Sequence, residues 1–293
     1  MTQAPPPDLP NLLVANGLAP HAARWQALIG GRTNRVWKVE TPTGAIICKL
    51  FAADENNPLY TNQARDEFAA LRALRAQDIA PEPLALLKFG ASDVLIYRYL
   101  VGAPWQQNVA EVADLLGRLH KLAPPIGWRV AETGSAALIR QCRKILRDCR
   151  DIAPDLPRDM PDPNILALDR TAPIHTDIVP NNILKTPQGL RLIDWQCPAL
   201  GDPCEDLASF LSPAMHRLYG TGALSAAQVQ VFLAAYPDQR IVRRYRALAV
   251  LYHWRIAAYC QWKVERGDAD YGAAQKLELL ALNKAEQSHS TYG

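Results

Sequence analysis

Several features are scarce in this chain of 293 residues, and each absence excludes a class of protein. No hydrophobic run approaches the length of about 18 residues that a membrane-spanning helix needs, and the first residues, MTQAPPPDLP, lack the basic and hydrophobic regions of a signal peptide. The net charge of +3 is small, and no stretch rich in Lys and Arg is interleaved with aromatic residues. We therefore expect neither a membrane nor a nucleic acid as a partner.

Cysteine is sparse as well. The six cysteines form no C-x-x-C pair and no Cys/His cluster with the spacing of a zinc site. In a chain without a signal peptide such cysteines are expected to be reduced thiols, so the sequence predicts a cytoplasmic protein. The content of 49% hydrophobic and 21% charged residues is ordinary for a globular protein, and the chain is long enough for one large domain or two modest ones.

The most informative segment covers residues 174–210. It contains the pattern His175-x-Asp177-x-x-x-x-Asn182 and, twelve residues after the Asn, Asp194. Phosphoryl transfer needs a carboxylate that receives the proton of the substrate hydroxyl, and an Asn and a second Asp that hold magnesium ions on the nucleotide phosphates. The pattern therefore predicts Asp177 as the catalytic residue and Asn182 and Asp194 as metal ligands, with His175 organising the loop.

Two short strands would bring these groups together. Residues 182–185 and 189–193 have the character of strands, and the segment between them, Thr186-Pro-Gln-Gly189, forms a turn. Because a hairpin brings its outer ends together, Asn182 and Asp194 could reach one metal ion. The alternative is a solvated loop that carries unrelated acids.

Two charged residues in the N-terminal part are candidates for a second functional set. Lys49 lies in the otherwise apolar strand expected at residues 45–50, and Glu67 lies on the apolar side of a helix expected at residues 65–76. A carboxylate in that position is costly without a countercharge, so we expect the two to pair. Kinase folds use such a pair to position the nucleotide phosphates. The alternative is two unrelated surface charges.

Segment 174–210 resembles the catalytic core of the aminoglycoside phosphotransferase and choline kinase superfamily, the small-molecule relatives of protein kinases. Its pieces Asp177-Ile-Val-Pro-Asn-Asn182 and Ile193-Asp194-Trp195 are most similar to bacterial choline kinase-like enzymes. The resemblance implies an α+β, two-lobed protein-kinase-like fold. A smaller N-terminal lobe with an antiparallel sheet would span residues 1–100, and a larger, mainly helical catalytic and acceptor-binding lobe would span residues 101–293.

The same resemblance implies ATP and Mg²⁺ as cosubstrates and a small molecule with a hydroxyl group as acceptor. The segment Gly30-Gly31-Arg-Thr-Asn34-Arg35 is similar to the phosphate loop of choline and thiamine kinases, and paired glycines let the backbone approach phosphates closely. We expect Gly30, Gly31 and Asn34 to bind the nucleotide with Lys49 and Glu67.

Three departures from protein kinases indicate a small-molecule enzyme. Thr176 stands where protein kinases have Arg, Trp195 replaces the Phe after the metal ligand, and no Ala-Pro-Glu segment is present. These departures argue against a protein substrate, and no protein partner is evident. Asp206 is expected to bond the catalytic loop. A catalytically silent nucleotide-binding pseudokinase remains the alternative from another class, although the complete residue set speaks against it.

The acceptor is less clearly encoded. Tyr252, Tyr259 and Trp262 share one face of a predicted late helix, and with Glu205 they could cage a cationic head group. Such a cage would suit choline, another amino alcohol or thiamine; the alternative is a helix that packs its rings into the core. Gln196 stands where choline kinase-like enzymes usually have an acid, so an amino sugar, a neutral sugar or an aminoglycoside also stays open.

Overall fold

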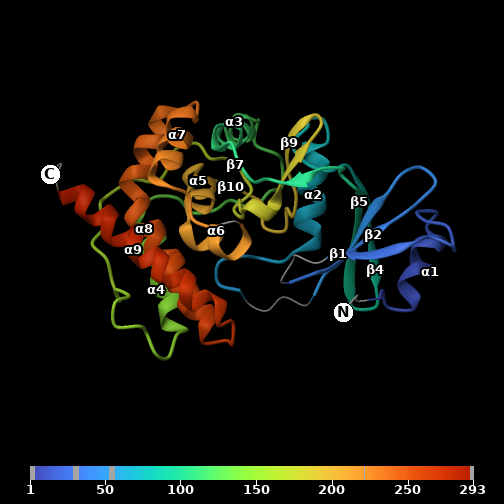
Figure 1. Cartoon of the computed structure of the whole chain (residues 1–293), viewed down its shortest axis with the longest axis horizontal. Coiled ribbons are helices and arrows are strands. Elements are labelled where there is room, and N and C mark those ends of the chain that lie inside the picture. The colour runs from blue at the N-terminus through green and yellow to red at the C-terminus, as the bar shows by residue number, and fades with distance from the viewer. Residues whose placement is uncertain (1–3, 29–32, 53–56, 221, 291–293) are drawn as a thin grey trace. The chain divides into compact units, whose positions relative to one another are not determined.

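A computed structural model gives the structure of the chain, and it describes residues 4–28, 33–52, 57–220 and 222–290. The chain divides into two compact units (Figure 1). The first, here called the sheet unit, contains Met1–Asn57, Thr61–Ala103 and Leu184–Cys197; the second, the helical unit, contains Pro58–Tyr60, Pro104–Ile183 and Pro198–Gly293. The predicted lobes divide the chain once near residue 100, whereas these units exchange two short segments.

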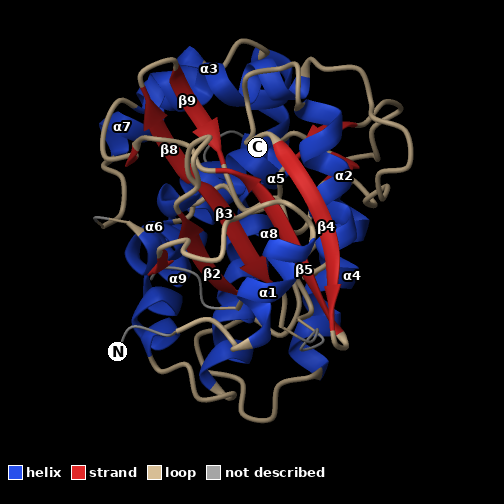
Figure 2. Ribbon diagram, turned by 90° about the vertical axis from the view of Figure 1, so that its right-hand side faces the viewer, coloured by secondary structure: helices blue, strands red, loops and turns tan. Residues whose placement is uncertain are grey.

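The sheet unit is built on a five-stranded antiparallel sheet with the strand order β1-β2-β3-β5-β4. The strands are β1 (Trp25–Leu28), β2 (Arg35–Val39), β3 (Ile46–Leu50), β4 (Pro83–Phe89) and β5 (Ser92–Arg98). Figure 2 shows β3, β5 and β4 running side by side. β3 lies in the middle and is buried at all five positions, because it is paired on both sides and covered on both faces.

Alternation along β3 assigns its side chains to two different faces. Ile46, Cys48 and Leu50 belong to a hydrophobic cluster with Leu9 and Leu13 of helix α1 (Asp8–Ala15). The side chains between them therefore project from the opposite face. Helix α2 (Ala64–Leu74) packs against β4 and β5 of the same sheet. Lys49, between Cys48 and Leu50, therefore lies on the face away from the α1 cluster.

A hairpin completes the sheet unit. Its strands are β8 (Ile183–Thr186) and β9 (Gly189–Leu192), and β6 (Ala103–Pro104) pairs with β8. Gly189 has a φ of 108°, a left-handed conformation that favours glycine, and the Thr186 hydroxyl donates to the Gly189 carbonyl at 2.8 Å. The predicted turn is therefore present. Asn182 lies just before the first strand, in the 3₁₀ turn η1 (Pro180–Asn182), and not within it.

The helical unit holds seven helices among its described residues. They are α3 (Val109–His120), α4 (Ser135–Arg147), α5 (Cys204–Leu211), α6 (Pro213–Tyr219), α7 (Ala226–Ala235), α8 (Gln239–Val264) and α9 (Asp270–Ser290). The long helix α8 packs against α9, α4 and α5. It begins at Gln239 because Asp238 caps it, accepting from the amide of Arg240 at 2.9 Å.

Two short strands lie among these helices. β7 (Ala172–Ile174) and β10 (Ala199–Gly201) pair antiparallel, with Ile174 opposite Ala199. A Cβ at Gly201 would lie 2.5 Å from a side-chain carbon of Ile174, so a larger residue here would displace that side chain. Residues 153–164, which include four prolines, contain no helix or strand.

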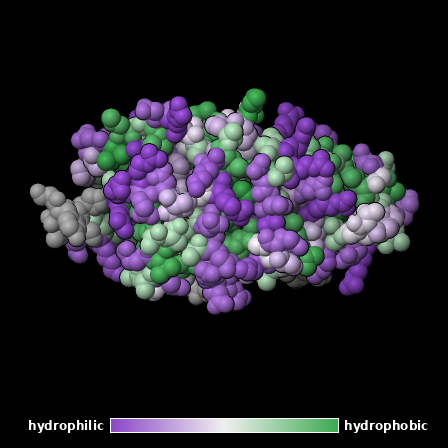
Figure 3. Space-filling model, turned by 90° about the horizontal axis from the view of Figure 1, so that it is seen from above, coloured by the Kyte–Doolittle hydropathy of each residue, from purple (hydrophilic) through white to green (hydrophobic). Residues whose placement is uncertain are grey.

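The surface is mixed in character. Hydrophilic residues cover much of the face in Figure 3, with smaller hydrophobic groups between them. Within the described part of the chain, no helix combines the length and the hydrophobicity that crossing a membrane would require.

Candidate active site

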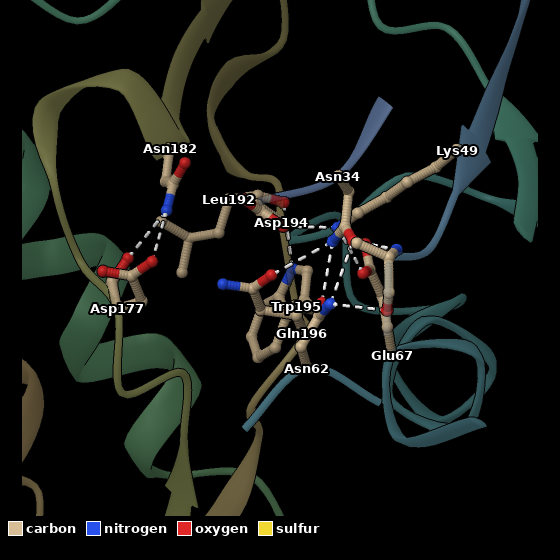
Figure 4. Close-up of polar contacts among 11 residues, drawn as sticks. Asn34, Lys49, Asn62, Glu67, Asp177, Asn182, Leu192, Asp194, Trp195 and Gln196 are labelled. Atoms are coloured by element: carbon tan, nitrogen blue, oxygen red, sulfur yellow. Dashed lines mark hydrogen bonds and ion pairs between the residues drawn. The ribbon is translucent and has the colours of Figure 1, made fainter. Parts of the chain in front are cut away.

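Asp177 and Asn182 are joined by hydrogen bonds within the helical unit. The Asn182 amide nitrogen donates to the Asp177 carbonyl at 3.0 Å and to its carboxylate oxygen Oδ2 at 3.2 Å (Figure 4). The 3₁₀ turn η1 makes this possible, because it folds the chain back over the four residues that lie between the two. Asp177 is half-buried and Asn182 is buried. The Asp177 side chain is therefore held on one side by an amide donor.

The loop before Asp177 has an unusual backbone. Thr176 has a φ of 71°, a left-handed conformation that is uncommon for a β-branched residue. Asp206 of α5 holds this loop: its Oδ2 accepts from the amide of His175 at 3.0 Å, and its Oδ1 accepts from the amide of Thr176 at 2.7 Å. The amide of Asp177 in turn donates to the His175 ring nitrogen Nδ1 at 3.2 Å. Asp206 thus bonds the loop that leads into Asp177, as the sequence predicts.

Lys49 lies between two carboxylates in the sheet unit. Its Nζ is 2.6 Å from Oε2 of Glu67 and also donates to Oδ1 of Asp194 (Figure 4). Glu67 belongs to the buried stripe of α2, together with Ala64, Leu71 and other residues at helical spacing. Lys49 is 2% exposed and Glu67 1%. The pairing that the sequence predicts between them is present.

The two carboxylates determine the charge state of the lysine. Burial by itself would lower the pKa of Lys49, but Asp194 and Glu67 favour the charged amine and leave its pKa raised. Burial raises the pKa of Glu67, and Lys49 opposes that shift. Lys49 is therefore positively charged at neutral pH, with its ammonium group fixed by two acceptors.

Asp194 follows β9 in a conformation with a φ of 63°. The next residue, Trp195, is fully buried, and its ring nitrogen donates to the Leu192 carbonyl at 3.0 Å. This bond closes the turn that contains Asp194. The Asp194 side chain keeps 29% of its surface exposed, so its carboxylate remains accessible while Lys49 binds one of its oxygens.

The sheet unit also contains a cluster of three side-chain amides, those of Asn34, Asn62 and Gln196. Asn34 exchanges hydrogen bonds with Asn62 at 2.8 and 3.0 Å, and its amide nitrogen donates to Gln196 at 3.3 Å (Figure 4). Its carbonyl oxygen also accepts from the amide of Ala52 at 3.0 Å. The predicted nucleotide residue Asn34 is thus rigidly held, whereas Gly30 and Gly31 lie outside the described residues.

Sequence reasoning missed Asn62 and the role of Gln196. Neither position carries a local signal, because isolated amide residues are common in loops and their partners here are distant in the sequence. Gln196 is the residue that replaces the expected acid. It accepts a hydrogen bond from Asn34, so its amide group organises the sheet unit.

The predicted acceptor residues all have partners in the helical unit. Glu205 forms a bidentate ion pair with Arg255, and Arg255 also donates to Gln141 at 2.7 Å. The rings of Tyr252, Tyr259 and Trp262 are buried, with 2%, 3% and 6% of their surfaces exposed. These contacts give the four residues a structural role in the helical unit. Their assignment to the acceptor stays a prediction.

Residues 24–248, more than half of the chain, match the model of the phosphotransferase enzyme family (APH). This chain belongs to that family. The matched range contains all five residues of the two hydrogen-bonded sets, Lys49, Glu67, Asp177, Asn182 and Asp194. The superfamily predicted from the sequence is thereby confirmed.

Similar proteins include further phosphotransferases. A thiamine kinase from Shigella boydii serotype 4 is 31% identical in an alignment of 158 residues, and the match covers 49% of this chain and 50% of that protein. The chain thus spans about half the length of the curated relatives it matches.

Solved structures share the fold over a longer range. Choline kinase from Cryptosporidium parvum Iowa II superimposes with a TM-score of 0.67 at 15% identity, over 97% of this chain and 96% of that one. The spectinomycin phosphotransferase APH(9)-Ia, crystallised with ADP and spectinomycin, gives a TM-score of 0.56 at 15% identity, over 90% and 93%. This likeness confirms the predicted α+β class, with an N-terminal antiparallel sheet and a mainly helical C-terminal part.

Proposed function

We propose that this phosphotransferase moves the γ-phosphoryl group of ATP to a hydroxyl of a small molecule and that Mg²⁺ takes part. The observation that carries the proposal is the buried Lys49 between Glu67 and Asp194. Removing a lysine and a glutamate from water costs free energy, so a buried pair of this kind indicates a functional requirement. Holding a fixed positive charge for nucleotide phosphates is that reason in kinase folds.

The donor set fits a magnesium ion bound together with phosphates. Within the described ranges, no group of three or more His, Cys, Asp or Glu residues could hold a metal ion. Mg²⁺ differs from zinc in this respect, since one or two carboxylates usually suffice when phosphates and waters supply the other ligands. The amide oxygen of Asn182 and the carboxylate of Asp194 are hard oxygen donors of this kind. Bound there, Mg²⁺ would supply neutralisation of the charge that develops on the phosphates.

Asp177 is the proposed catalytic residue. Its carboxylate orients the acceptor hydroxyl and takes the proton as the oxygen of that hydroxyl bonds to the γ-phosphorus. The bond from this phosphorus to the bridging oxygen breaks in the same step, and ADP leaves. Asn182 keeps one carboxylate oxygen of Asp177 in place through its amide nitrogen. Lys49 and Glu67, with Gly30, Gly31 and Asn34, are proposed to bind the nucleotide.

We propose an amino alcohol such as choline, or a related compound, as the acceptor. The fold similarity to choline kinase supports this choice. The match to thiamine kinase over half of the chain favours thiamine as the second candidate. A cationic acceptor at Glu205 would have to compete with Arg255 for the carboxylate. Gln196, which stands in place of the expected acid, keeps amino sugars and aminoglycosides as further alternatives.

The test is ADP release from Mg·ATP across a panel of choline, ethanolamine, thiamine, amino sugars, neutral sugars and aminoglycosides. For the acceptor that is turned over, Asp177→Asn should lower kcat by about 10²–10⁴-fold, the usual contribution of a general base. Asp169→Asn removes an exposed carboxylate from the same unit and should leave kcat unchanged.

Two outcomes would contradict the proposal. Turnover that survives Asp177→Asn would remove Asp177 from the catalytic role. Silence on the whole panel, with Mg·ATP still bound, would favour a nucleotide-binding pseudokinase.

A further inference from the structure

The carboxylate behind the catalytic loop has a third partner that the mechanism above does not use. Asp206 is completely buried and accepts from the amides of His175 and Thr176. The ring nitrogen Nε2 of His120, the last residue of α3, lies 3.0 Å from the same oxygen Oδ2 of Asp206. His120 is itself enclosed, with 4% of its side chain exposed. Residues from two helices thus meet at one carboxylate.

Tyr236 completes the arrangement. It follows α7, is 2% exposed, and its hydroxyl lies 2.8 Å from Nδ1 of His120. Burial raises the pKa of Tyr236, and the nearby Asp206 adds to the shift, so the hydroxyl keeps its proton. A hydroxyl that donates to Nδ1 leaves the Nε2–H group of the ring to donate to Asp206. The Nε2–H group of His120 is therefore the donor of the hydrogen bond to the Asp206 carboxylate.

The loop that Asp206 holds is under strain. A left-handed Thr costs on the order of 1–3 kcal/mol and persists only where surrounding contacts enforce it. Thr176 has this conformation, and the hydrogen bond that its backbone amide donates to Asp206 is one of those contacts. Asp177 is the next residue, so the direction of the catalytic carboxylate depends on the conformation of Thr176.

We propose that His120 and Tyr236 are positioning residues for Asp177. They fix the orientation of the Asp206 carboxylate, which holds the amides of His175 and Thr176 and thereby keeps the strained loop in its active form. This inference rests on the proposed phosphotransferase function. His120 comes from α3 and Asp206 from α5, and Tyr236 directly follows α7. The conformation of the catalytic loop therefore depends on how these three helices pack.

The first test needs no acceptor. Tyr236→Phe removes only the hydroxyl, and hydrogen–deuterium exchange of a peptide covering residues 174–178 is then measured in the full-length protein. We expect the amides of His175 and Thr176 to exchange about three- to tenfold faster, because losing one buried hydrogen bond loosens the loop by roughly that factor. Tyr245→Phe is the matched control, since it removes another buried tyrosine hydroxyl from the helical unit and should leave this peptide unchanged.

A second pair of variants distinguishes positioning from packing. His120→Leu removes the donor to Asp206, whereas His120→Gln keeps an amide donor on a side chain of similar reach. The Leu variant should exchange faster at residues 174–178 than the Gln variant. With an acceptor, kcat should fall about tenfold or more in the Leu variant and the KM for ATP should stay within about twofold, because only the loop is misplaced.

The exchange measurement decides the inference without reference to turnover. Wild-type exchange at residues 174–178 in both Tyr236→Phe and His120→Leu would overturn it. An acceptor panel without turnover would instead overturn the proposed function, and the exchange data would stand apart from that result.

Discussion

At the residue scale, Lys49 shows how a costly position is maintained. Its strand is otherwise apolar and buried, so the charged amine needs acceptors within reach, and Glu67 and Asp194 supply them. The partnership with Glu67 follows from the helical phase of α2, which places that carboxylate on the buried stripe. The contact with Asp194 could not be predicted, because it depends on where the hairpin lies against the sheet.

Removing the lysine should destabilise the protein more than removing the pair. Lys49→Met leaves the Glu67 carboxylate buried without a countercharge, which typically costs about 3–5 kcal/mol of unfolding free energy. The double variant Lys49→Met/Glu67→Gln removes both charges and should recover a large part of this loss. Urea unfolding followed by circular dichroism measures both values.

An exposed ion pair in the same sheet is the control. Lys88 on β4 lies 2.7 Å from Asp93, with 61% of the lysine side chain exposed. Lys88→Met should change the unfolding free energy by less than about 1 kcal/mol, as exposed pairs do. Equal losses for Lys49→Met and for the double variant would mean that the buried carboxylate is not the source of the cost.

At the scale of elements, the sequence predicted those with a clear period or a clear turn. Strand β3, helix α2 and the β8–β9 hairpin all lie within a few residues of their expected positions. Two missed elements have weak signals. Helix α1 follows three prolines, has no side-chain cap and is only eight residues long, and β4 begins with Pro83 and lacks alternation.

The close contact between α3 and Pro237 leads to a prediction at the scale of elements. Gly117 lies within α3, and a Cβ there would lie 2.3 Å from a ring carbon of Pro237. Ala is favoured over Gly in a helix by about 1 kcal/mol, but overpacking costs about 1–3 kcal/mol. We expect Gly117→Ala to lower the melting temperature, measured by calorimetry, because the clash exceeds the gain in helix propensity.

The control is a glycine in a helix with room for a methyl group. At Gly272, in α9, the nearest atom to an added Cβ is 3.8 Å away, an ordinary van der Waals contact. Gly272→Ala should raise the melting temperature. A rise for both variants would show that the α3 contact with Pro237 yields without cost.

At the scale of the whole molecule, nucleotide binding should be visible in stability. A ligand that binds only the folded protein adds about 2.7 kcal/mol to the unfolding free energy when its concentration is 100 times its Kd. We expect Mg·AMP-PNP to raise the melting temperature, because Lys49, Asn182 and Asp194 are proposed to hold the nucleotide and the metal ion. The measurement does not depend on knowing the acceptor.

Two controls separate the metal from the lysine. EDTA should remove most of the thermal shift if Asn182 and Asp194 act through Mg²⁺, and Lys49→Met should reduce it at saturating Mg²⁺. Lys88→Met should keep the wild-type shift. A shift of the same size with and without Mg²⁺ would contradict the proposed metal ligands.

The sequence by itself determined the family, the fold class and the residues with short-range signatures. Asp177 and Asn182 lie five residues apart, and one turn of chain is enough to join them, so their relation is already present in the spacing. Only the tertiary structure decided the partners of the buried polar groups. Asp206 with His120, Glu205 with Arg255 and Asn34 with Gln196 are each far apart in the chain. A buried charge or amide needs a partner, but the packing of helices and strands selects which one, and that selection leaves no periodic trace in the sequence.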